Sequence, residues 1–453
     1  MTDTVVIGAG LAGLCAAIRL AQAGQSVTLL TKGLGGAQLG QGTIDVLGYV
    51  PSGGADRAVE RPFDEWGGFV AQHPAHPYAR LDAATVRAGV DWLAGLLPDL
   101  LLPGDGRNHL VPTAVGAMRP TYLVQPSMVW PETASVAVVG PRQIKDFYPE
   151  LVAANLARTA QVKAKGYHID LPARPGEVDS SPLLYALALD DPEFRADFAR
   201  TVAAVIGDEA AVCLPAILGL RALGVAKALA KSLGRPVVEA LMVPPSIPGM
   251  RINEALTALA KSLSVRIIIG AKVTSYQATA ERLEAVVLHQ AGRDKAYAAD
   301  NFVYAPGGFE SGALALDSHG QVAETLFGLP LSGADAPDLV TGDYWADQQL
   351  FAVGVAVDDR MRPLDIHGQA FHPNLYAAGG LLAGAIRWGE KSGDAIAVAS
   401  AVRACDAILG VYPTGSAAVP KPKPVAKVTP RPAQKPRGRF VKWLRWLFRR
   451  EGK

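Results

Sequence analysis

The sequence has few cysteines, and they do not cluster. Only Cys15, Cys213 and Cys405 occur in 453 residues, and no two of them form a Cys-x-x-Cys pair. Zinc sites and iron–sulfur clusters need several neighbouring thiolates. The sequence therefore predicts no metal site. The simplest interpretation is a reducing compartment, with the three thiols buried as small apolar residues.

Long apolar runs are missing too. No stretch of eighteen residues is both apolar and uncharged, so we expect no transmembrane helix. The first strand begins at once with Thr4–Ile7, and we therefore expect no secretory signal before it. Together these absences favour a cytoplasmic location.

The composition is that of a folded globular protein, with 49% hydrophobic and 19% charged residues and 47 glycines. The net charge of +2 conceals two regions of opposite sign. Residues 419–453 hold twelve Lys or Arg and one acid, a net of +11, which leaves −9 for residues 1–418. A basic tail on an acidic body indicates that the tail has its own partner, and the acidic body argues against nucleic-acid binding.

The chain opens with a strand, a glycine turn and a helix. Thr4–Ile7 is an apolar strand, Gly8-x-Gly10-x-x-Gly13 is the turn, and Leu14–Ala23 has helical spacing. In such turns the first glycine allows a tight bend, the second lets the backbone approach a phosphate, and the third lets helix and strand pack closely. Free amides at the helix start then hold the phosphate charge. The turn predicts cofactor binding.

One expected element of a dinucleotide site is missing. An acid about 20 residues after the turn would bind the adenosine ribose, but the second strand, Ser26–Thr31, ends in Thr31-Lys32-Gly33. FMN has no adenosine to recognise, so we favour noncovalent FMN over FAD. The alternative is that the Thr31 backbone or a residue elsewhere binds the ribose.

Further glycine turns follow apolar strands late in the chain. One contains Gly307 and Gly308, a second contains Gly379 and Gly380, and Ser392-Gly393 opens the last helix. A flavin needs close passage of the chain and a helix N-terminus at its pyrimidine edge. Any one of these turns could be a plain loop, but together with the first turn they predict a flavin site.

Alternating strands and helices predict an α/β fold with a parallel sheet. Between these parts the chain becomes rich in proline, with helical patterns at Ala83–Leu97 and Glu209–Leu233. The α/β pattern returns with a helix at Ile252–Leu263 and ends with one at Asp394–Leu409. We expect a Rossmann-like flavin-binding domain at 1–60 and 246–410, an inserted cap domain at 61–245, a disordered Pro/Lys-rich linker at 411–437 and a basic amphipathic helix at 438–453.

Several motifs resemble a known family. The late glycine turns are similar to those of the fumarate reductase and succinate dehydrogenase flavoproteins. The fuller resemblance, over residues 1–410, is to the B subunit of anaerobic glycerol-3-phosphate dehydrogenase. The matching segments are Gly40–Leu47, His76–Tyr78, Asp105–His109, Thr113–Gly116, Arg119–Thr121 and Pro244–Arg251.

The resemblance implies oxidation of glycerol 3-phosphate to dihydroxyacetone phosphate, linked to quinone. It also implies FMN as cofactor, and it places Gly42 and Thr43 at the flavin. Family members pair with an A-type flavoprotein subunit and an iron–sulfur subunit that holds the complex on the cytoplasmic membrane. The basic tail departs from the family and puts the need for that anchor in doubt.

Five side chains are candidates for chemistry outside the flavin. Arg119, Arg251 and Arg387 lie beside Gly or Pro turns, where a guanidinium suits a phosphate or carboxylate. A structural salt bridge is the alternative for each. His76 and His109 lie in polar loops where a base could act, although a structural role is the alternative for both.

The tail sequence from Arg439 to Arg450 is amphipathic at helical spacing. Its apolar side chains cover an arc of about 160°, formed by Phe440, Val441, Trp443, Leu444, Leu447 and Phe448. Lys442, Arg445 and Arg449 lie opposite. An anionic membrane surface is the expected partner, which predicts a peripheral protein on the inner face of the cell membrane. A partner protein is the alternative.

The sequence therefore predicts the B subunit of a glycerol-3-phosphate dehydrogenase. Two other functions stay open: a stand-alone FAD oxidoreductase of another small acid, and a flavin relay or scaffold subunit without its own substrate. The sequence does not say which subunit oxidises the substrate.

Overall fold

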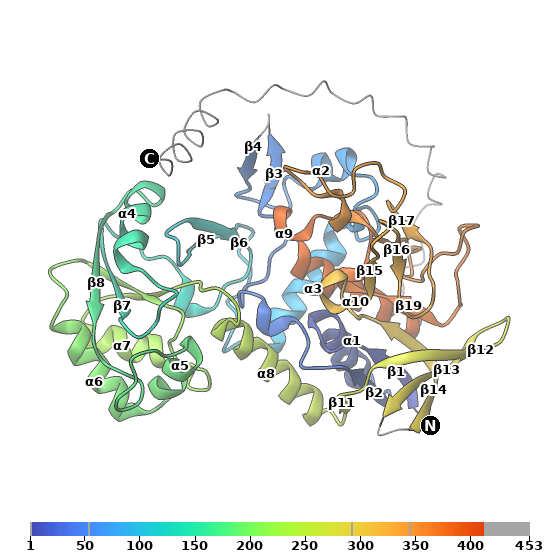
Figure 1. Ribbon diagram of the computed structural model, residues 1–453, viewed down its shortest axis with the longest axis horizontal. Coiled ribbons are helices and arrows are strands. Elements are labelled where there is room, and N and C mark those ends of the chain that lie inside the picture. The colour runs from blue at the N-terminus through green and yellow to red at the C-terminus, as the bar shows by residue number, and fades with distance from the viewer. Residues whose placement is uncertain (1, 53–54, 291–292, 344–345, 412–453) are drawn as a thin grey trace, which may run out of the picture. The chain divides into compact units, whose positions relative to one another are not determined.

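The computed structural model describes residues 2–52, 55–290, 293–343 and 346–411 (Figure 1). The expected linker from residue 412 onward and the tail helix at 438–453 lie outside the described residues. The fold is mixed α/β, as the alternating pattern predicted.

The larger sheet has seven strands and draws on both ends of the described chain. Its strand order is β11-β2-β1-β14-β13-β12, with β19 paired to β14. The strands are β1 (Thr2–Ile7), β2 (Val27–Thr31), β11 (Arg266–Ile269), β12 (Val273–Ala278), β13 (Leu283–Gln290), β14 (Arg293–Tyr304) and β19 (Leu375–Ala377). Strands β11, β2, β1, β14 and β19 are parallel, whereas β12 and β13 are antiparallel. Tyr304 pairs with both Ile7 and Ala377, so β1, β14 and β19 end at the same edge.

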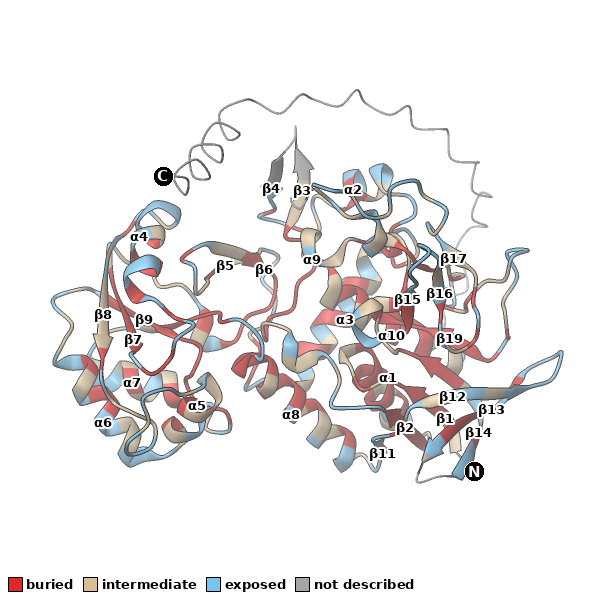
Figure 2. Ribbon diagram, in the orientation of Figure 1, coloured by how far each residue is buried: buried red, intermediate tan, exposed pale blue. Residues whose placement is uncertain are grey.

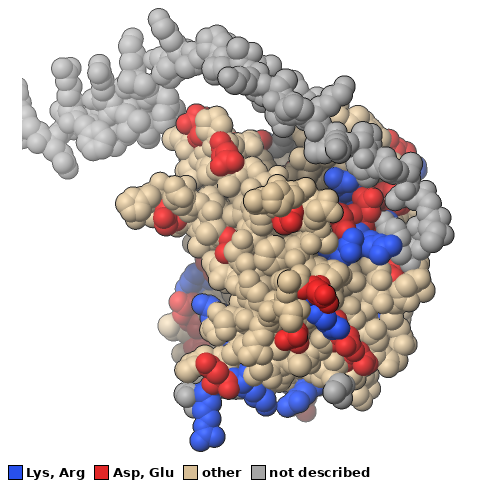
Figure 3. All heavy atoms as spheres, turned by 90° about the vertical axis from the view of Figure 1, so that its right-hand side faces the viewer, with Lys and Arg blue, Asp and Glu red and all other residues tan. Residues whose placement is uncertain are grey.

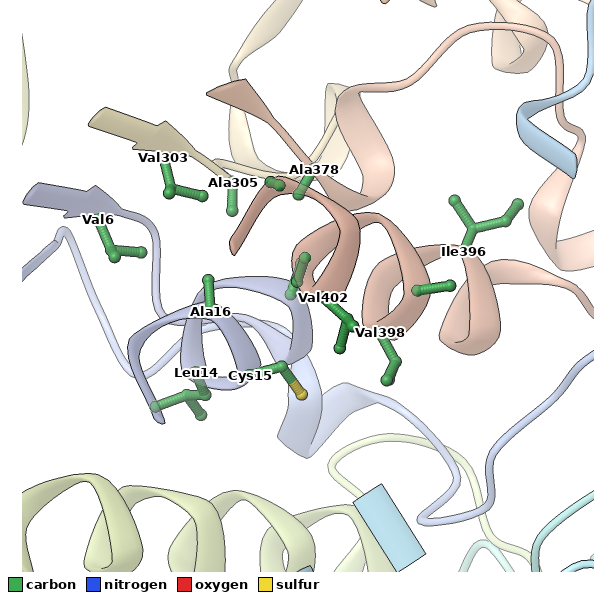
Figure 4. Packing of buried hydrophobic residues seen from close by; sticks show 14 of the residues in the cluster. Val6, Leu14, Cys15, Ala16, Val303, Ala305, Ala378, Ile396, Val398 and Val402 are labelled. Atoms are coloured by element: carbon green, nitrogen blue, oxygen red, sulfur yellow. The ribbon is translucent and has the colours of Figure 1, made fainter. Parts of the chain in front are cut away.

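Four helices pack side by side in the order α8, α1, α10, α3. They are α1 (Leu11–Gln22), α3 (Ala83–Leu96), α8 (Ile247–Ser262) and α10 (Gly393–Leu409). Figure 4 shows Cys15 and Ala16 of α1 beside Val398 and Val402 of α10. Small side chains let these two helices approach closely, which brings their N-termini to the same sheet edge. All three cysteines are buried, as the sequence predicted.

A second hydrophobic core surrounds a smaller, parallel sheet of order β10-β9-β7-β8. Its strands are β7 (Ser135–Pro141), β8 (Lys163–Ile169), β9 (Ala211–Pro215) and β10 (Val237–Ala240). Its helices are α4 (Pro149–Thr159), α5 (Pro182–Asp190), α6 (Pro192–Ala203) and α7 (Val225–Leu233). In Figure 1 these elements form the left-hand group.

Two expectations about the middle of the chain need correction. The single helical pattern expected at Glu209–Leu233 was wrong, because residues 211–215 form the buried strand β9 and only 225–233 form a helix. A fully buried strand is apolar on both faces, so its apolar run cannot be told from a buried helix by spacing. The expected inserted domain at 61–245 also starts too early. Buried side chains of 66–101, including Trp66 of α2 (Trp66–Gln72), belong to the first core.

Short two-stranded antiparallel sheets, one short α-helix and several 3-10 turns complete the described fold. The strands are β3 (Tyr49–Ser52), β4 (Ala55–Ala58), β5 (His109–Pro112), β6 (Met118–Thr121), β15 (Leu314–Leu316), β16 (Val322–Glu324), β17 (Leu331–Ser332) and β18 (Gly354–Val355), and the helix is α9 (Arg387–Glu390). Figure 2 shows the buried residues concentrated in α1, α3, α10 and the parallel strands. On the face in Figure 3, acidic and basic side chains lie beside one another in small groups.

Candidate functional site

Three parallel strands end at one cavity of about 720 Å³. Gly8 follows β1, Ala305 follows β14 and Gly379 follows β19, and all three residues line it. In open α/β sheets, ligands bind beyond the carboxyl ends of the strands. The cavity is therefore the candidate site of the expected cofactor.

The first glycine turn has the geometry that its spacing predicted. Gly8 has φ +105°, and a Cβ there would lie 2.1 Å from the carbonyl oxygen of Ala305. A Cβ on Gly13 would lie 1.9 Å from the carbonyl oxygen of Gly8, so Gly13 serves helix–strand packing and does not line the cavity. A Cβ on Gly10 would have no atom within 4 Å. Gly10 thus leaves open space in which a ligand can approach the backbone.

Two helix N-termini without side-chain caps meet at the cavity. Helix α1 starts after Gly10 and α10 starts after Ser392, and neither of these residues gives a side-chain cap hydrogen bond. Leu11 of α1 and Gly393 of α10 line the cavity. The absence of a side-chain cap and the helix dipole favour a bound anion, although in α10 the amide of Ala395 already donates to the carbonyl of Asp45. The site therefore fits a group with a phosphate at one end and, at the other, a ring that becomes negative when it accepts electrons, as a flavin has.

The cavity continues past the first turn to the end of β2. Thr31 and Lys32 line it there, beside Lys272 from the segment before β12. The Thr31 hydroxyl donates to the carbonyl of Gly33 at 2.6 Å, so its proton is already used in a hydrogen bond within its own turn. Sequence reasoning missed Lys272, because only the pairing of β11 with β2 brings this segment to the cavity.

The late glycine turns surround Arg387. Gly307, Gly379 and Gly380 line the cavity with it, whereas Gly308 packs beneath them against the backbone of Gly380. A Cβ on Gly380 would lie 2.3 Å from a guanidinium nitrogen of Arg387, so the glycine makes room for this side chain.

Arg387 has one loose ionic partner. Its guanidinium lies 3.6 Å from the carboxylate of Glu310, whose side chain is 61% exposed. A cation with so weak a partner at a cavity wall can bind an anionic ligand. The structure thus places this predicted residue where it could contact a substrate.

Arg119 does not line the cavity itself but contacts Thr43, which does. It ion-pairs with Asp45 and donates to the hydroxyl of Thr43 at 3.2 Å. Thr43 and Gly42 line the cavity. The hydroxyl of Thr121 donates to the other oxygen of Asp45 at 2.6 Å. Arg119 therefore orients the segment that forms this wall.

Asp394 is the one carboxyl at the start of α10 that reaches the cavity wall. Its carboxylate accepts the backbone amide of Asp45 at 3.2 Å. Burial, the largest cause, and the negative charge of Asp45 raise the pKa of Asp394 to about 7, against the opposing effects of the Asp45 amide, Arg119 and Lys391. Sequence reasoning missed Asp394, although an acid directly after Gly393 in the first helical turn was a visible signal.

His76 is buried and does not line the cavity. Its Nδ1 accepts the amide of Tyr78 at 3.1 Å, so the ring proton is on Nε2, which donates to Glu390 at 3.0 Å. Ser392, also a predicted site residue, donates to the same carboxylate at 2.9 Å. Burial alone would raise the pKa of Glu390, but the hydrogen bonds from His76 and Ser392 outweigh it and lower that pKa. These residues fix the segment between α9 and α10.

Arg251 and His109 lie elsewhere. Arg251 is buried and pairs through two nitrogens with both oxygens of Glu239, each at 2.9 Å. It also donates to Gln125 and borders a separate cavity of about 440 Å³. This pair connects α8 to β10, a strand of the second core. His109 lies at the start of β5, 3.7 Å from Asp105, and is not among the residues that line the first cavity.

Two other features are absent from the described residues. In that part of the chain, no group of three or more His, Cys, Asp or Glu is arranged to hold a metal ion. No helix within the same residues has both the length and the apolar character to cross a membrane.

Comparisons with known proteins give a consistent family. Residues 3–395 match the family described as FAD binding domain. The probable anaerobic glycerol-3-phosphate dehydrogenase B subunit of Halobacterium salinarum is 31% identical over 88% of this chain and 96% of that protein. The anaerobic glycerol-3-phosphate dehydrogenase B subunit of Pectobacterium atrosepticum is 29% identical over 90% of this chain and 98% of that protein. Among solved structures, 3-ketosteroid delta1-dehydrogenase from Sterolibacterium denitrificans has a TM-score of 0.42 at 11% identity, over 90% of this chain and 99% of that one.

Proposed function

Because the chain belongs to the FAD-binding-domain family and to the family of anaerobic glycerol-3-phosphate dehydrogenase B subunits, we propose that it is a flavin-dependent oxidoreductase that acts on glycerol 3-phosphate. The product is dihydroxyacetone phosphate, and the electrons pass towards quinone. The observation that carries this proposal is the cavity where two uncapped helix N-termini meet the guanidinium of Arg387.

The chain's own residues hold the cofactor noncovalently. The amides after Gly10 would bind its phosphate, Gly42 and Thr43 would form one wall of its site, and the start of α10 at Gly393 would stabilise negative charge on its ring system. When bound, the flavin supplies the acceptor for two electrons, and the positive end of α10 stabilises the charge that these electrons bring.

We propose FAD as the flavin. The cavity extends beyond the phosphate turn to Thr31, Lys32 and Lys272, which gives an adenosine half a place to bind. The family description names FAD. The preference for FMN, which came from the missing ribose acid, is therefore not supported. Backbone groups near Thr31 can replace that acid, as the alternative interpretation of the sequence allowed.

Arg387 is our candidate for binding the substrate's phosphate, since it lines the cavity and has only the loose partner Glu310. Arg119 and His76 act as positioning residues, the first through Asp45 and Thr43 and the second through Glu390. We assign Arg251 to the connection with Glu239 and not to catalysis.

A relay subunit is the second candidate function, and one observation favours it. Trp388, next to Arg387 in sequence, is 58% exposed and makes an edge-to-face contact with Phe351 at 6.0 Å between ring centroids. An exposed aromatic pair beside the cavity could contact a partner that exchanges electrons. If the chain is a relay, an A-type flavoprotein subunit oxidises the substrate and passes the electrons to it. An iron–sulfur subunit or the basic tail then holds the assembly on the inner face of the cell membrane.

The purified full-length protein, alone and with its A-type partner, tests the proposal. Mass spectrometry of acid-released cofactor should find FAD. Under anaerobic conditions, glycerol 3-phosphate should bleach the flavin absorbance of the complex, and glycerol, which lacks the phosphate, should not. The isolated chain should turn over poorly.

Each outcome separates the candidate functions. Bleaching of this chain's flavin that persists when the partner's flavin site is disabled supports an enzyme. Bleaching that requires the partner's flavin supports the relay. A flavin that no three-carbon phosphate bleaches in either preparation would point to the stand-alone oxidoreductase of another small acid.

A further inference from the structure

The wall of the cavity contains few groups that can exchange a proton with a bound ligand. Its carboxyl groups, among the described residues, are those of Glu310 and Asp394, and it contains no histidine. Glu310 is 61% exposed and lies beside Arg387. Asp394 is half-buried, at the point where α10 begins and where Thr43 and Arg387 also border the cavity. Asp394 is thus the carboxyl shielded from bulk water.

Asp394 does not serve its own helix as a cap. An acid in the first turn usually satisfies the free amides of that turn. Here the hydrogen bond to the carboxylate comes from the amide of Asp45, in another segment, and no side chain caps α10 at Ser392. Capping of its own helix therefore does not explain the hydrogen bond that Asp394 accepts.

The charges around Asp394 come from several elements. Asp45 precedes β3, Arg119 belongs to β6, Lys391 lies between α9 and α10, and Arg387 belongs to α9. Asp45 is already held by Arg119 and by Thr121. Of the neighbouring carboxyls Asp45 and Asp394, it is therefore Asp394 that lines the cavity and can accept further hydrogen bonds there.

Oxidation of an alcohol releases a proton as well as two electrons. The C–H bond breaks and its hydrogen leaves with the electron pair to the oxidised flavin, while the O–H bond breaks and the C=O double bond forms. A group at the cavity must take the hydroxyl proton, and it acts best when its pKa lies near the working pH.

We propose that the carboxylate of Asp394 takes up the proton that accompanies electron entry into this cavity, and that in turnover this proton comes from the substrate's hydroxyl. The second part rests on the proposed function. Burial and the charge of Asp45 raise the pKa of Asp394 towards the working pH, which is what a proton acceptor needs. The added electrons make the cavity more negative and favour the protonated acid further.

Two measurements on the flavin-loaded full-length protein test the inference. The first uses dithionite alone and records the infrared difference spectrum between the oxidised and reduced protein at pH 7.5. A band of a newly protonated carboxyl should appear in the wild type and be absent in Asp394→Asn. Asp406→Asn removes a carboxyl from the outer end of the same helix, where Asp406 pairs with Arg19, and should keep the band.

The second measurement is made on the complex with the A-type partner and follows anaerobic bleaching of this chain's flavin by glycerol 3-phosphate as a function of pH. The wild-type rate should rise as Asp394 ionises. Asp394→Asn should bind flavin normally, be slower by about 100-fold and lose this pH dependence. Asp394→Glu should recover part of the rate.

The infrared and the bleaching measurements can contradict different parts of the inference. Absence of the carboxyl band in the reduced wild type, or its persistence in Asp394→Asn, overturns the role of Asp394. A band that behaves as expected, together with no bleaching by glycerol 3-phosphate at any pH, supports Asp394 and rejects the proposed substrate. A bleaching rate that Asp394→Asn leaves unchanged overturns the transfer of the substrate's proton to this residue.

Discussion

The backbone amide of Asp45 donates a hydrogen bond to the carboxylate of Asp394 at 3.2 Å, although 349 positions separate the two residues. The amide of Ala395 returns a hydrogen bond to the carbonyl of Asp45 at 3.0 Å. Thr43 on the same segment and Gly393 on the same helix both line the cavity. One reciprocal contact thus positions two of its walls, and any shift of one would move the other.

We expect Gly10→Val to yield folded, flavin-free protein. The side chain would enter the open space over the turn, where no protein atom lies within 4 Å, and would block the approach of a phosphate. The backbone of Gly10 has φ −71°, which valine tolerates. Flavin absorbance per protein should fall at least about tenfold, a loss of about 1.4 kcal/mol or more. Gly95→Val, at an exposed position of α3 with equally free surroundings, is the control. Full flavin content in the Gly10 variant would mean that the phosphate binds elsewhere.

The stability of the flavin-free protein should depend on pH through Asp394. The pKa of this residue is raised from 3.8 to about 7, so between these values the folded state holds more protons than the unfolded state. Its contribution is therefore fully present below about pH 4 and is lost as the pH rises through 7. Asp394→Asn cannot ionise. The free energy of unfolding of this variant should exceed that of the wild type by more at pH 8.5 than at pH 5. The two differences should themselves differ by on the order of 2 kcal/mol, a figure reduced because the side chain borders an open cavity.

Denaturant unfolding at the two pH values measures this difference. Asp406→Asn, on the same helix, should show the wild-type pH dependence. If the free energies of unfolding of Asp394→Asn and the wild type differ by the same amount at both pH values, the raised pKa does not belong to Asp394.

Arg387→Ala should weaken substrate binding more than flavin binding. Loss of the guanidinium removes a charge-assisted contact worth about 1.5–3 kcal/mol, which corresponds to a KM for glycerol 3-phosphate raised by about 10- to 100-fold. Arg387→Lys should recover part of this loss, since an ammonium lacks the planar fork. Arg200→Ala, at a site 72% exposed on α6, is the control. A KM that neither Arg387 variant changes would place the phosphate at another residue.

Arg251→Met should destabilise the protein without removing the flavin. The substitution leaves the buried carboxylate of Glu239 without its cation, which costs about 3–5 kcal/mol. Arg221→Met, an exposed arginine 3.9 Å from Glu254, should change the free energy of unfolding by less than about 1 kcal/mol. Flavin content and unfolding are measured on the same preparations. A variant of wild-type stability that has lost turnover would restore Arg251 as a catalytic candidate.

The basic tail should hold the protein on anionic bilayers. Its aromatic arc supplies apolar burial, and each cation near the surface adds about 1 kcal/mol. Salt screens the second contribution only, so binding should weaken but persist as salt rises. Truncation after Ala418 should leave the flavin content unchanged and release the protein from sedimenting liposomes. Equal sedimentation of both forms would identify the tail as a partner-binding segment instead.

Local features of the site could be predicted from the sequence. The spacing of Gly8, Gly10 and Gly13 after an apolar strand required a tight turn at a helix start, and the structure has that turn. The limits of α3 and α10 agree with the apolar spacing to within one residue. These features depend on backbone angles and hydrogen bonds between residues a few positions apart, which a short window of sequence specifies.

Only the tertiary structure decided which charged groups meet. Arg251 and Arg387 were both expected beside Gly or Pro turns, yet Arg251 lies within α8 in a buried pair with Glu239, and Arg387 borders the cavity. The raised pKa of Asp394 comes from burial and from Asp45, which Arg119 and Thr121 of β6 hold in place. The sequence by itself determined the turns and helices that line the cavity. The protonation and pairing of the surrounding side chains depend on burial and on distances across the fold, and these exist only after the chain has packed.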